Sequence, residues 1–363
     1  LIRVHTIIRM MLLIMENTTM KNSQKRNQKT SKYIKIAVLC VSFIVIICMM
    51  FFIYNDMKDK KHHTADDSAD NKEYSSIEVD GKDYNYNTGL INILFIGFDS
   101  SADIESLEAK NSNTGENGRA DSIYVLSLDR RNKTMQILAL SRDTMTDIEV
   151  TDASGQVVGW GKDHLAFAYS YGDGKDKSCR LMSDAVSNLV NNIPIVYYCA
   201  ANINSLGTLI NIVGSVEVQV PNDDLKQFGP EYEKGQTLIV DEYNIERFVR
   251  FRDIGTDFSN EGRMERQKVF LEAYMNKFKQ LAKDEATIVK TTKMLSTLVT
   301  NISVGELNDF ISLYAESSFD INSDYYKPSG ENKTGQAHDE FYIDEKAFQK
   351  LILKMFYMDS SLS

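Results

Sequence analysis

The chain has 363 residues, of which 43% are hydrophobic and 25% charged, and its formal net charge is −10. These are the proportions of a globular protein, and the length allows one large domain or two small ones. Residues 1–35 carry eight Lys/Arg against one Glu, so the acidic excess lies in the rest of the chain. An acidic domain binds nucleic acid poorly, because attraction to phosphate supplies most non-specific affinity, and we expect no nucleic-acid partner. The basic tail indicates contact with an anionic membrane surface.

An uncharged apolar run, IAVLCVSFIVIICMMFFIY, occupies residues 36–54. It is long enough to cross a bilayer as a helix, and a buried helix of a soluble domain is the alternative. Six lysines and arginines precede it within residues 21–35, which predicts a cytoplasmic N-terminus and an extracytoplasmic remainder. No small-residue cleavage site follows, so we expect a retained signal-anchor and a single-pass membrane protein. We expect the start to be over-extended, with Met15 or Met20 the true one; a second membrane segment is the alternative.

The cysteines and histidines give no metal-binding pattern. Cys179 and Cys199 could pair outside the cell, but we expect them to be buried small apolar residues, because neither has metal-ligand spacing. The five histidines include no HxxxH pair. The sequence therefore argues against a zinc enzyme.

Order is expected to begin after a polar stalk at residues 55–90. Residues 91–99, INILFIGFD, are almost continuously apolar and predict a strand buried on both faces. Two further runs, 122–129 and 134–141, are joined by the turn RRNK and predict a hairpin-like pair of strands.

Helical and strand patterns then alternate to the end of the chain, with no repeat and no second linker. We expect helices at 179–190, 205–214, 242–249, 262–282, 285–299, 305–316 and 344–357, strands at 195–200 and 216–220, and a polar loop at 322–340. This alternation predicts one α/β domain over residues 91–363, a three-layer α/β/α fold with a mixed central sheet, preceded by a single transmembrane helix.

Two charged motifs, GRADS and SRDT, flank the predicted hairpin. If its strands are antiparallel neighbours, Arg119 and Asp121 at the start of the first lie beside Arg142 and Asp143 at the end of the second. If the preceding strand runs parallel to the second, its exit residue Asp99 reaches the same edge. Because ligands in α/β proteins favour such strand ends, we predict that these five residues share one rim.

More arginines follow this pattern. Arg250 and Arg252 are two residues apart, on one side of the chain if it is extended there, and Arg263, Arg266 and Gln267 share one helix face. Ten arginines lie between 119 and 266, and none in 55–118 or 267–363. Bidentate phosphate recognition favours the guanidinium group, so we predict a shared anion site. Its six arginines are Arg119, Arg142, Arg250, Arg252, Arg263 and Arg266; pairing with surface carboxylates, the alternative, is expected for Arg130, Arg131, Arg180 and Arg247.

Carboxylates inside an anion site suggest a divalent cation. Mg²⁺ (or Mn²⁺) takes one or two carboxylates plus substrate phosphates, and Asp99 and Asp121 could hold it against a diphosphate. The arginines would then neutralise the charge that builds on the leaving phosphate. A plain salt bridge between Asp121 and Arg119 is the alternative. Asp143 could orient Arg142 or accept a proton, and we favour orientation.

Taken in order over about residues 90–282, the motifs GFD, RADS, SRDT, VRFRD and GRMERQ resemble those of the LytR-CpsA-Psr family of cell-wall proteins. The resemblance implies an extracytoplasmic α/β/α domain that transfers a glycopolymer from a polyprenyl-diphosphate lipid to peptidoglycan in a Gram-positive-type envelope. A phosphodiester forms on a sugar hydroxyl and polyprenyl phosphate leaves. A non-catalytic regulator that binds polyprenyl phosphate and a diphosphate hydrolase are the alternatives.

Matched residue by residue, the resemblance makes Asp99 and Asp121 the magnesium ligands. The implied diphosphate contacts are Arg119, Arg142, Arg250, Arg252, Arg263 and Gln267. The expected catalytic set is Arg119, Arg142, Asp143, Arg250 and Arg252. The chain departs from the family pattern at Ser141, where proline is usual, and at Asp163, where asparagine is common. The segment DFSNEG is also longer than the usual DFG, which leaves the loop geometry near Arg263 open.

Overall fold

The computed structural model describes residues 76–100, 118–152, 156–253, 255, 257–336 and 338–359. All of them belong to one compact unit, Lys72–Ser363. The basic tail, the apolar run at 36–54 and the first part of the predicted stalk lie outside the described residues. None of the helices in the described part of the chain is long and apolar enough to cross a membrane.

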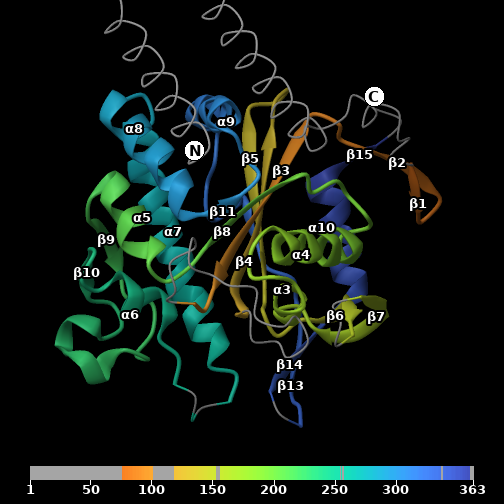
Figure 1. Cartoon of the computed structure of the whole chain (residues 1–363), viewed down its shortest axis with the longest axis horizontal. Coiled ribbons are helices and arrows are strands. Elements are labelled where there is room, and N and C mark those ends of the chain that lie inside the picture. The colour runs from red at the N-terminus through yellow and green to blue at the C-terminus, as the bar shows by residue number, and fades with distance from the viewer. Residues whose placement is uncertain are drawn as a thin grey trace, which may run out of the picture. The chain divides into compact units, whose positions relative to one another are not determined.

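A six-stranded mixed sheet forms the centre of this unit, in the order β11-β8-β3-β4-β5-β12 (Figure 1). The strands are β3 (Leu90–Phe98), β4 (Ala120–Asp129), β5 (Thr134–Leu140), β8 (Tyr197–Ala201), β11 (Val299–Thr300) and β12 (Tyr325–Tyr326). Strand β4 is antiparallel to both β3 and β5. The two outer strands of this trio are therefore parallel to each other, as the predicted rim requires.

Helices cover both faces of the sheet, which confirms the three-layer α/β/α prediction (Figure 1). Leu94 and Ile96 pack against α3 (Phe167–Ser170), α4 (Asp176–Leu189) and α10 (Glu345–Phe356) on one face. Ile93 packs with α7 (Asn260–Leu281) and α9 (Val304–Glu316) on the other. This division follows from the two-residue period of a strand, which sends successive side chains to opposite faces.

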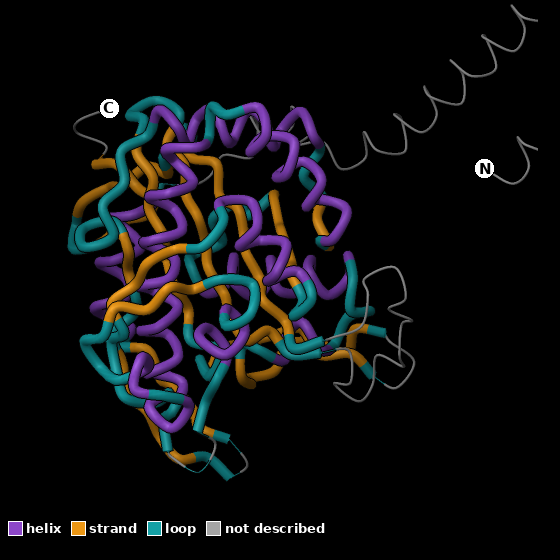
Figure 2. The backbone as a smooth tube through the Cα atoms, turned by 90° about the vertical axis from the view of Figure 1, so that its left-hand side faces the viewer, coloured by secondary structure: helices purple, strands orange, loops and turns teal. Residues whose placement is uncertain are grey.

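A side lobe extends from α7 and has its own apolar core, which includes Ile210 and Phe248. It contains α5 (Ser205–Val213), β9 (Val216–Gln219), the 3₁₀ turns Lys226–Phe228 and Pro230–Tyr232, β10 (Thr237–Val240), α6 (Ile245–Arg250) and α8 (Glu285–Met294). A further 3₁₀ turn, Leu295–Thr297, follows α8. Figure 2 views the molecule from the side that carries this lobe. The side lobe matters for the site because α6 and α7 both reach the end of the central sheet.

The structure corrects the predicted stalk and the predicted polar loop. Within the stalk, β1 (Ile77–Val79) and β2 (Lys82–Tyr86) form a small sheet with β15 (Tyr357–Asp359). The loop contains the hairpin of β13 (Gly330–Thr334) and β14 (Asp339–Ile343), and a second unpredicted hairpin joins β6 (Met145–Thr151) to β7 (Val157–His164). Most side chains of these strands are half-exposed or exposed, so their sequences lack the clear apolar alternation by which strands are recognised.

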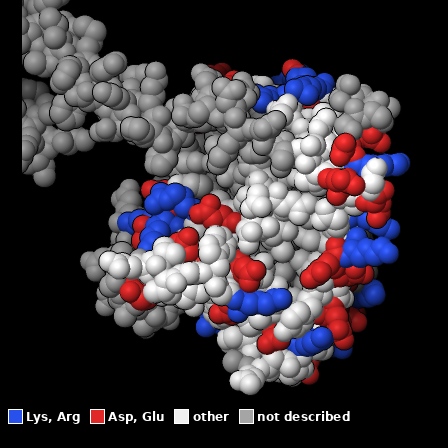
Figure 3. All heavy atoms as spheres, turned by 90° about the vertical axis from the view of Figure 1, so that its right-hand side faces the viewer, with Lys and Arg blue, Asp and Glu red and all other residues white. Residues whose placement is uncertain are grey.

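Cys179 and Cys199 are free and buried, which confirms their expected role as small apolar residues. They belong to cores on opposite faces of the central sheet, which explains why they do not pair. On the face shown in Figure 3, acidic and basic side chains lie interspersed.

Candidate functional site

The predicted rim begins where β3 ends. Asp99 and Arg119 are joined twice: the Asp99 amide donates to the Arg119 carbonyl at 3.1 Å, and the Arg119 amide donates to Asp99 Oδ1 at 2.5 Å. Gly118 precedes this pair with φ of +91°, a conformation that glycine adopts readily. The backbone therefore places the Asp99 carboxyl group at the start of β4.

Asp121 is the second carboxylate of the rim. Burial raises the pKa of Asp99, and the charge of Asp121 raises it further, so the two carboxyl groups repel each other in a partly desolvated setting. Asp99 Oδ2 and Asp121 Oδ2 have no hydrogen-bond donor within the described part of the chain. Two carboxylates with open oxygens are the donor set that Mg²⁺ prefers when substrate phosphates complete its shell.

Two guanidinium groups hold the other oxygen of Asp121. Arg142 Nη1 forms an ion pair with Asp121 Oδ1, and Arg263 Nη1 lies 3.4 Å from the same oxygen. Arg263 Nη2 also donates to the Asp121 carbonyl at 3.3 Å. Burial lowers the pKa of Arg263, which is only 3% exposed, although the Asp121 charge opposes this shift. One half-buried and one buried cation thus share one carboxylate.

The Nε atoms of Arg142 and Arg263 are buried, and neither has a hydrogen-bond partner in the residues that the structure describes. Arg142 Nε lies 3.5 Å from Asp143 Oδ1, close enough for an ion pair but not a hydrogen bond. Buried donors are almost always satisfied in folded proteins, because an unmade bond costs about 1–3 kcal/mol. The rim is therefore suited to an anionic ligand that would accept from both donors.

Asn260 ties the arginines to Asp143. Its Nδ2 donates to Asp143 Oδ2 at 2.9 Å and to Ser141 Oγ at 3.1 Å, and its Oδ1 accepts from Arg263 Nη2 at 2.7 Å. Asn260 lies in the lengthened DFSNEG segment, and Ser141 stands where the family pattern has proline. Two departures from that pattern thus meet in one hydrogen-bonded network. Sequence reasoning missed Asn260, although its i, i+3 spacing to Arg263 was a usable signal.

Asp143 is buried, and burial raises its pKa, while Arg142, Arg252 and Arg263 lower it. Its carboxylate oxygens face Arg142 and Asn260. This geometry supports the orienting role favoured for Asp143.

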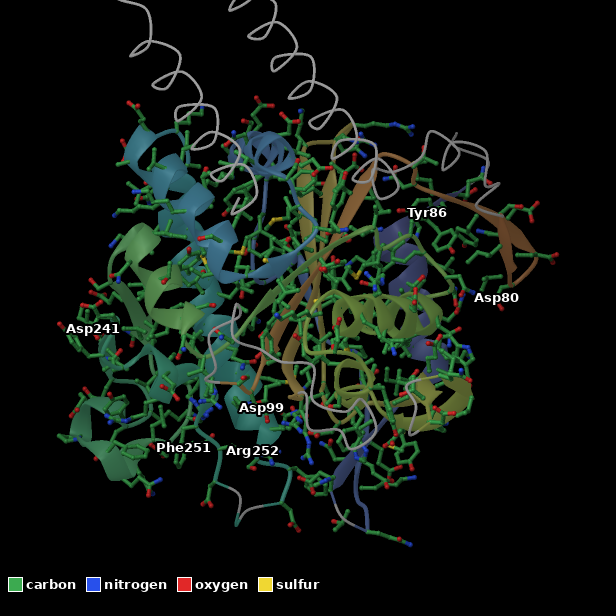
Figure 4. All side chains as sticks on the ribbon, in the orientation of Figure 1. Asp80, Tyr86, Asp99, Asp241, Phe251 and Arg252 are labelled. Atoms are coloured by element: carbon green, nitrogen blue, oxygen red, sulfur yellow. The ribbon has the colours of Figure 1, made fainter. Side chains whose placement is uncertain are left out.

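The structure divides the VRFRD arginines. The charge of Arg252 acts on both Asp143 and Arg263, and Figure 4 labels it in the same lower region as Asp99. Arg250 instead ends α6, and its Nη1 bonds Glu246 Oε1 at 2.6 Å, one turn earlier on the same helix. The expected extended arrangement of the pair is wrong, because the chain is still helical at Arg250.

Arg266 contacts other groups than Asp121 and its arginines. It is 0% exposed, its Nε donates to the Phe248 carbonyl at 2.9 Å, and its Nη2 donates to the Phe251 carbonyl. Its Nη1 forms an ion pair with Asp224 Oδ2 at 2.5 Å and also donates to Asn222. These contacts close the C-terminal end of α6, which is a structural role.

Gln267 joins three elements. Its Nε2 donates to Ser122 Oγ at 2.8 Å and to the Val249 carbonyl at 3.0 Å, and its Oε1 accepts from the Tyr124 hydroxyl at 2.9 Å. The amide is thereby occupied with fastening α7 to β4 and α6. This arrangement positions Arg263, one turn earlier on α7.

Arg119 completes the rim beside an aromatic group. Its guanidinium carbon lies 5.1 Å above the centre of the Phe167 ring, within the range of a cation–π contact. His164 contacts the same ring edge-on at 5.4 Å. Its Nδ1 lies 3.0 Å from Asp163 Oδ1, and this hydrogen bond is the main cause that raises the pKa of His164. Asp163 departs from the family pattern, and its neighbour His164 is a site residue that the sequence did not predict.

Comparison with known proteins gives the family. The LytR_cpsA_psr family model matches residues 49–355. The chain belongs to that family.

Relatives cover most of the chain. A polyisoprenyl-teichoic acid–peptidoglycan teichoic acid transferase, TagU of Enterococcus faecalis, is 24% identical over 319 residues, which are 86% of this chain and 92% of that protein. TagV of Bacillus subtilis, named for the same activity, is 31% identical over 282 residues, 69% of this chain and 65% of that one. The crystal structure of B. subtilis TagV superposes with a TM-score of 0.53 at 25% identity, covering 73% of this chain and 96% of that one. The LytR_cpsA_psr fold is therefore shared.

Proposed function

We propose that this protein transfers a glycopolymer from a polyprenyl-diphosphate lipid to peptidoglycan, by attack of a sugar hydroxyl on the sugar-bearing phosphate. The observation that carries the proposal is the pair of buried Nε donors of Arg142 and Arg263, which have no hydrogen-bond partner among the described residues and lie beside two partly open carboxylates. A site with buried cationic donors and carboxylates suits a ligand with several acceptor oxygens. A diphosphate has that chemistry, and its arginine contacts can be bidentate.

The arginines would act on the leaving group. Phosphoryl transfer depends chiefly on positioning and on stabilising the charge that develops on phosphate oxygens. Arg142 and Arg263 are already fixed by Asp121 and Asn260, so little reorganisation accompanies substrate binding. Arg119 and Arg252 extend the positive region on two sides. Arg250 and Arg266 are not needed for this role.

Asp99 and Asp121 would hold a divalent cation such as Mg²⁺ or Mn²⁺, through the carboxylate oxygens that have no donor among the described residues. Burial raises the pKa of Asp99, and the Asp121 charge raises it further; a cation would offset this repulsion. When bound, the ion supplies positive charge that offsets the phosphate charge in the transition state. The protein's own part is to fix the spacing of the two carboxylates through the Asp99–Arg119 backbone pair.

The lipid tail needs an apolar surface near the rim. Phe95 lies on β3 between β4 and β8, in the middle of the sheet, yet it is 37% exposed. Ile93, two residues before Phe95 and on the same face of β3, packs in the core shared with α7. We assign this Phe95 surface, with partly buried apolar residues of α5 and α7 such as Leu209 and Tyr274, to the polyprenyl chain. Each buried CH₂ would contribute about 0.8 kcal/mol.

The relatives' names support the proposed substrates, and the N-terminal sequence supports the proposed location. TagU and TagV are named for transfer of teichoic acid to peptidoglycan. Residues 36–54 would anchor the protein in the cell membrane as a single-pass helix, with the LytR_cpsA_psr domain outside. Such an anchor raises the effective concentration of a membrane-borne donor.

The substitution Asp121→Ala tests the proposal in the full chain, reconstituted with a polyprenyl-diphosphate disaccharide, isolated peptidoglycan and Mg²⁺. We expect transfer to peptidoglycan to fall by at least about 10²-fold, because the substitution removes a metal ligand and the anchor of two arginines. Arg130→Ala, at an exposed turn, is the control and should leave transfer unchanged. If wild-type protein only binds the donor, the regulator hypothesis replaces ours; if it releases the disaccharide phosphate into solution, the hydrolase hypothesis does.

A further inference from the structure

His338 lies next to the rim, immediately before β14. Its ring centre lies 5.9 Å from that of His164 and 6.0 Å from that of Phe167. The Arg119 guanidinium group packs on the same Phe167 ring. His338 therefore lies near an arginine that we expect to bind the diphosphate. The β14 backbone is held there, since the amide of Phe341 donates to the Asp143 carbonyl at 2.7 Å.

The ring nitrogens of His338 can accept a proton from a ligand, whereas the polar atoms of His164 and Asp143, the other candidate bases, are occupied. In the described part of the chain no group hydrogen bonds to either nitrogen, and the side chain is exposed. His164 uses both of its nitrogens, on Asp163 and on the Asp339 carbonyl. Asp143 is buried and faces Arg142 and Asn260. His338 is therefore the group of this cluster best able to meet an incoming hydroxyl.

The neighbours of His338 lower its pKa. Partial desolvation by its neighbours lowers its pKa, and so do the charges of Arg119, His164 and Arg142, which outweigh the opposing charge of Asp143. Asp163, on β7, also interacts through its charge with His338. Its hydrogen bond to His164 raises the pKa of His164 and so favours the protonated form of that ring. A histidine with its pKa below the usual value is unprotonated near pH 7, which is the state that a general base requires.

We propose that His338 is the general base of the transfer, a role that rests on the proposed function. Its imidazole takes the proton of the acceptor sugar hydroxyl as that oxygen forms a bond to the sugar-bearing phosphorus. The bond from this phosphorus to the bridging oxygen breaks, and polyprenyl phosphate leaves with the electron pair. The imidazolium group then gives its proton to solvent, so atoms and charge balance.

The test is His338→Gln in the full chain, with the polyprenyl-diphosphate disaccharide as donor and peptidoglycan as acceptor. General-base catalysis is worth about 10²–10⁴-fold, so we expect kcat to fall by about that factor while the donor's dissociation constant stays within about threefold. Gln336→Ala, an exposed change in the same loop, is the control. A variant with wild-type kcat, or one that loses donor binding as strongly as rate, would overturn the role of His338.

The pH profile separates a base from a merely structural histidine. The wild-type transfer rate should rise as pH increases through the lowered pKa of His338. This rising limb of the pH–rate profile should be absent from the residual rate of His338→Gln. His164→Gln removes a neighbouring positive charge, so the limb should move to higher pH. A limb that persists in His338→Gln would contradict the proposal. Wild-type protein that never transfers would instead contradict the proposed function itself.

Discussion

Arg266 distinguishes a structural arginine from a substrate-binding one, and we expect Arg266→Met to destabilise the domain. The side chain is 0% exposed and bonds two carbonyl groups at the end of α6, as well as Asp224. Removing one partner of a buried ion pair costs about 3–5 kcal/mol, because the remaining charge and acceptors lose their partner. For a domain of this size, about 2–4 °C of melting temperature is lost per kcal/mol. The expected fall is thus about 6–20 °C.

Urea and thermal unfolding of the full chain, followed by circular dichroism without any donor, measure this effect. Arg130→Met, at an exposed position, should change the free energy of unfolding by less than about 0.5 kcal/mol. Donor binding by Arg266→Met should be retained at temperatures where the variant is folded. Unchanged stability combined with lost binding would refute the structural role and restore Arg266 to the diphosphate site.

Three further substitutions probe neighbouring groups. Asn260→Ala removes hydrogen bonds to Asp143 and Arg263, each worth about 1.5–3 kcal/mol; loss of the equivalent of one of them from the transition state would lower transfer at saturating donor about 10–150-fold, and an unchanged rate would count against a positioning role. Phe95→Ser should raise KM for a long polyprenyl donor far more than for a short-chain diphosphate, and equal losses would contradict the lipid assignment. His164→Gln should cost more stability at about pH 6 than at about pH 9 in urea unfolding. Because folding raises the pKa of His164, its contribution to the free energy of unfolding is complete below the pKa of the unfolded chain. That contribution is lost as pH rises through the pKa of the folded protein, so an equal cost at both pH values would exclude this linkage.

The rim could be predicted because it depends on strand order alone. Once β3, β4 and β5 are neighbours, Asp99, Arg119, Asp121 and Arg142 must reach one edge, and apolar runs with a tight turn reveal that arrangement. Burial of both faces fixes the register along most of β3 and β4, and the register shift between Gly97 and Phe98 still leaves Asp99 bonded to Arg119 at this edge.

The helix arginines could not be assigned in the same way. Spacing on a helix tells which residues share a face, but not which carbonyl groups the neighbouring elements present to it. Arg263 meets Asp121 on β4, whereas Arg266, three residues later, meets the end of α6. The spacing of Asn260 to Arg263 was visible in the sequence, but the contacts of Asn260 with Asp143 and of His338 with His164 join residues more than 100 positions apart.

The central claim is that the rim transfers a glycan phosphate to peptidoglycan, and product analysis tests it most directly. Full-length protein would be incubated with a polyprenyl-diphosphate disaccharide, isolated peptidoglycan and Mg²⁺, and both products identified by mass spectrometry. We predict polyprenyl monophosphate and a disaccharide joined to a peptidoglycan sugar through one phosphodiester, in equal amounts. Polyprenyl diphosphate, or disaccharide phosphate free in solution, would contradict the account.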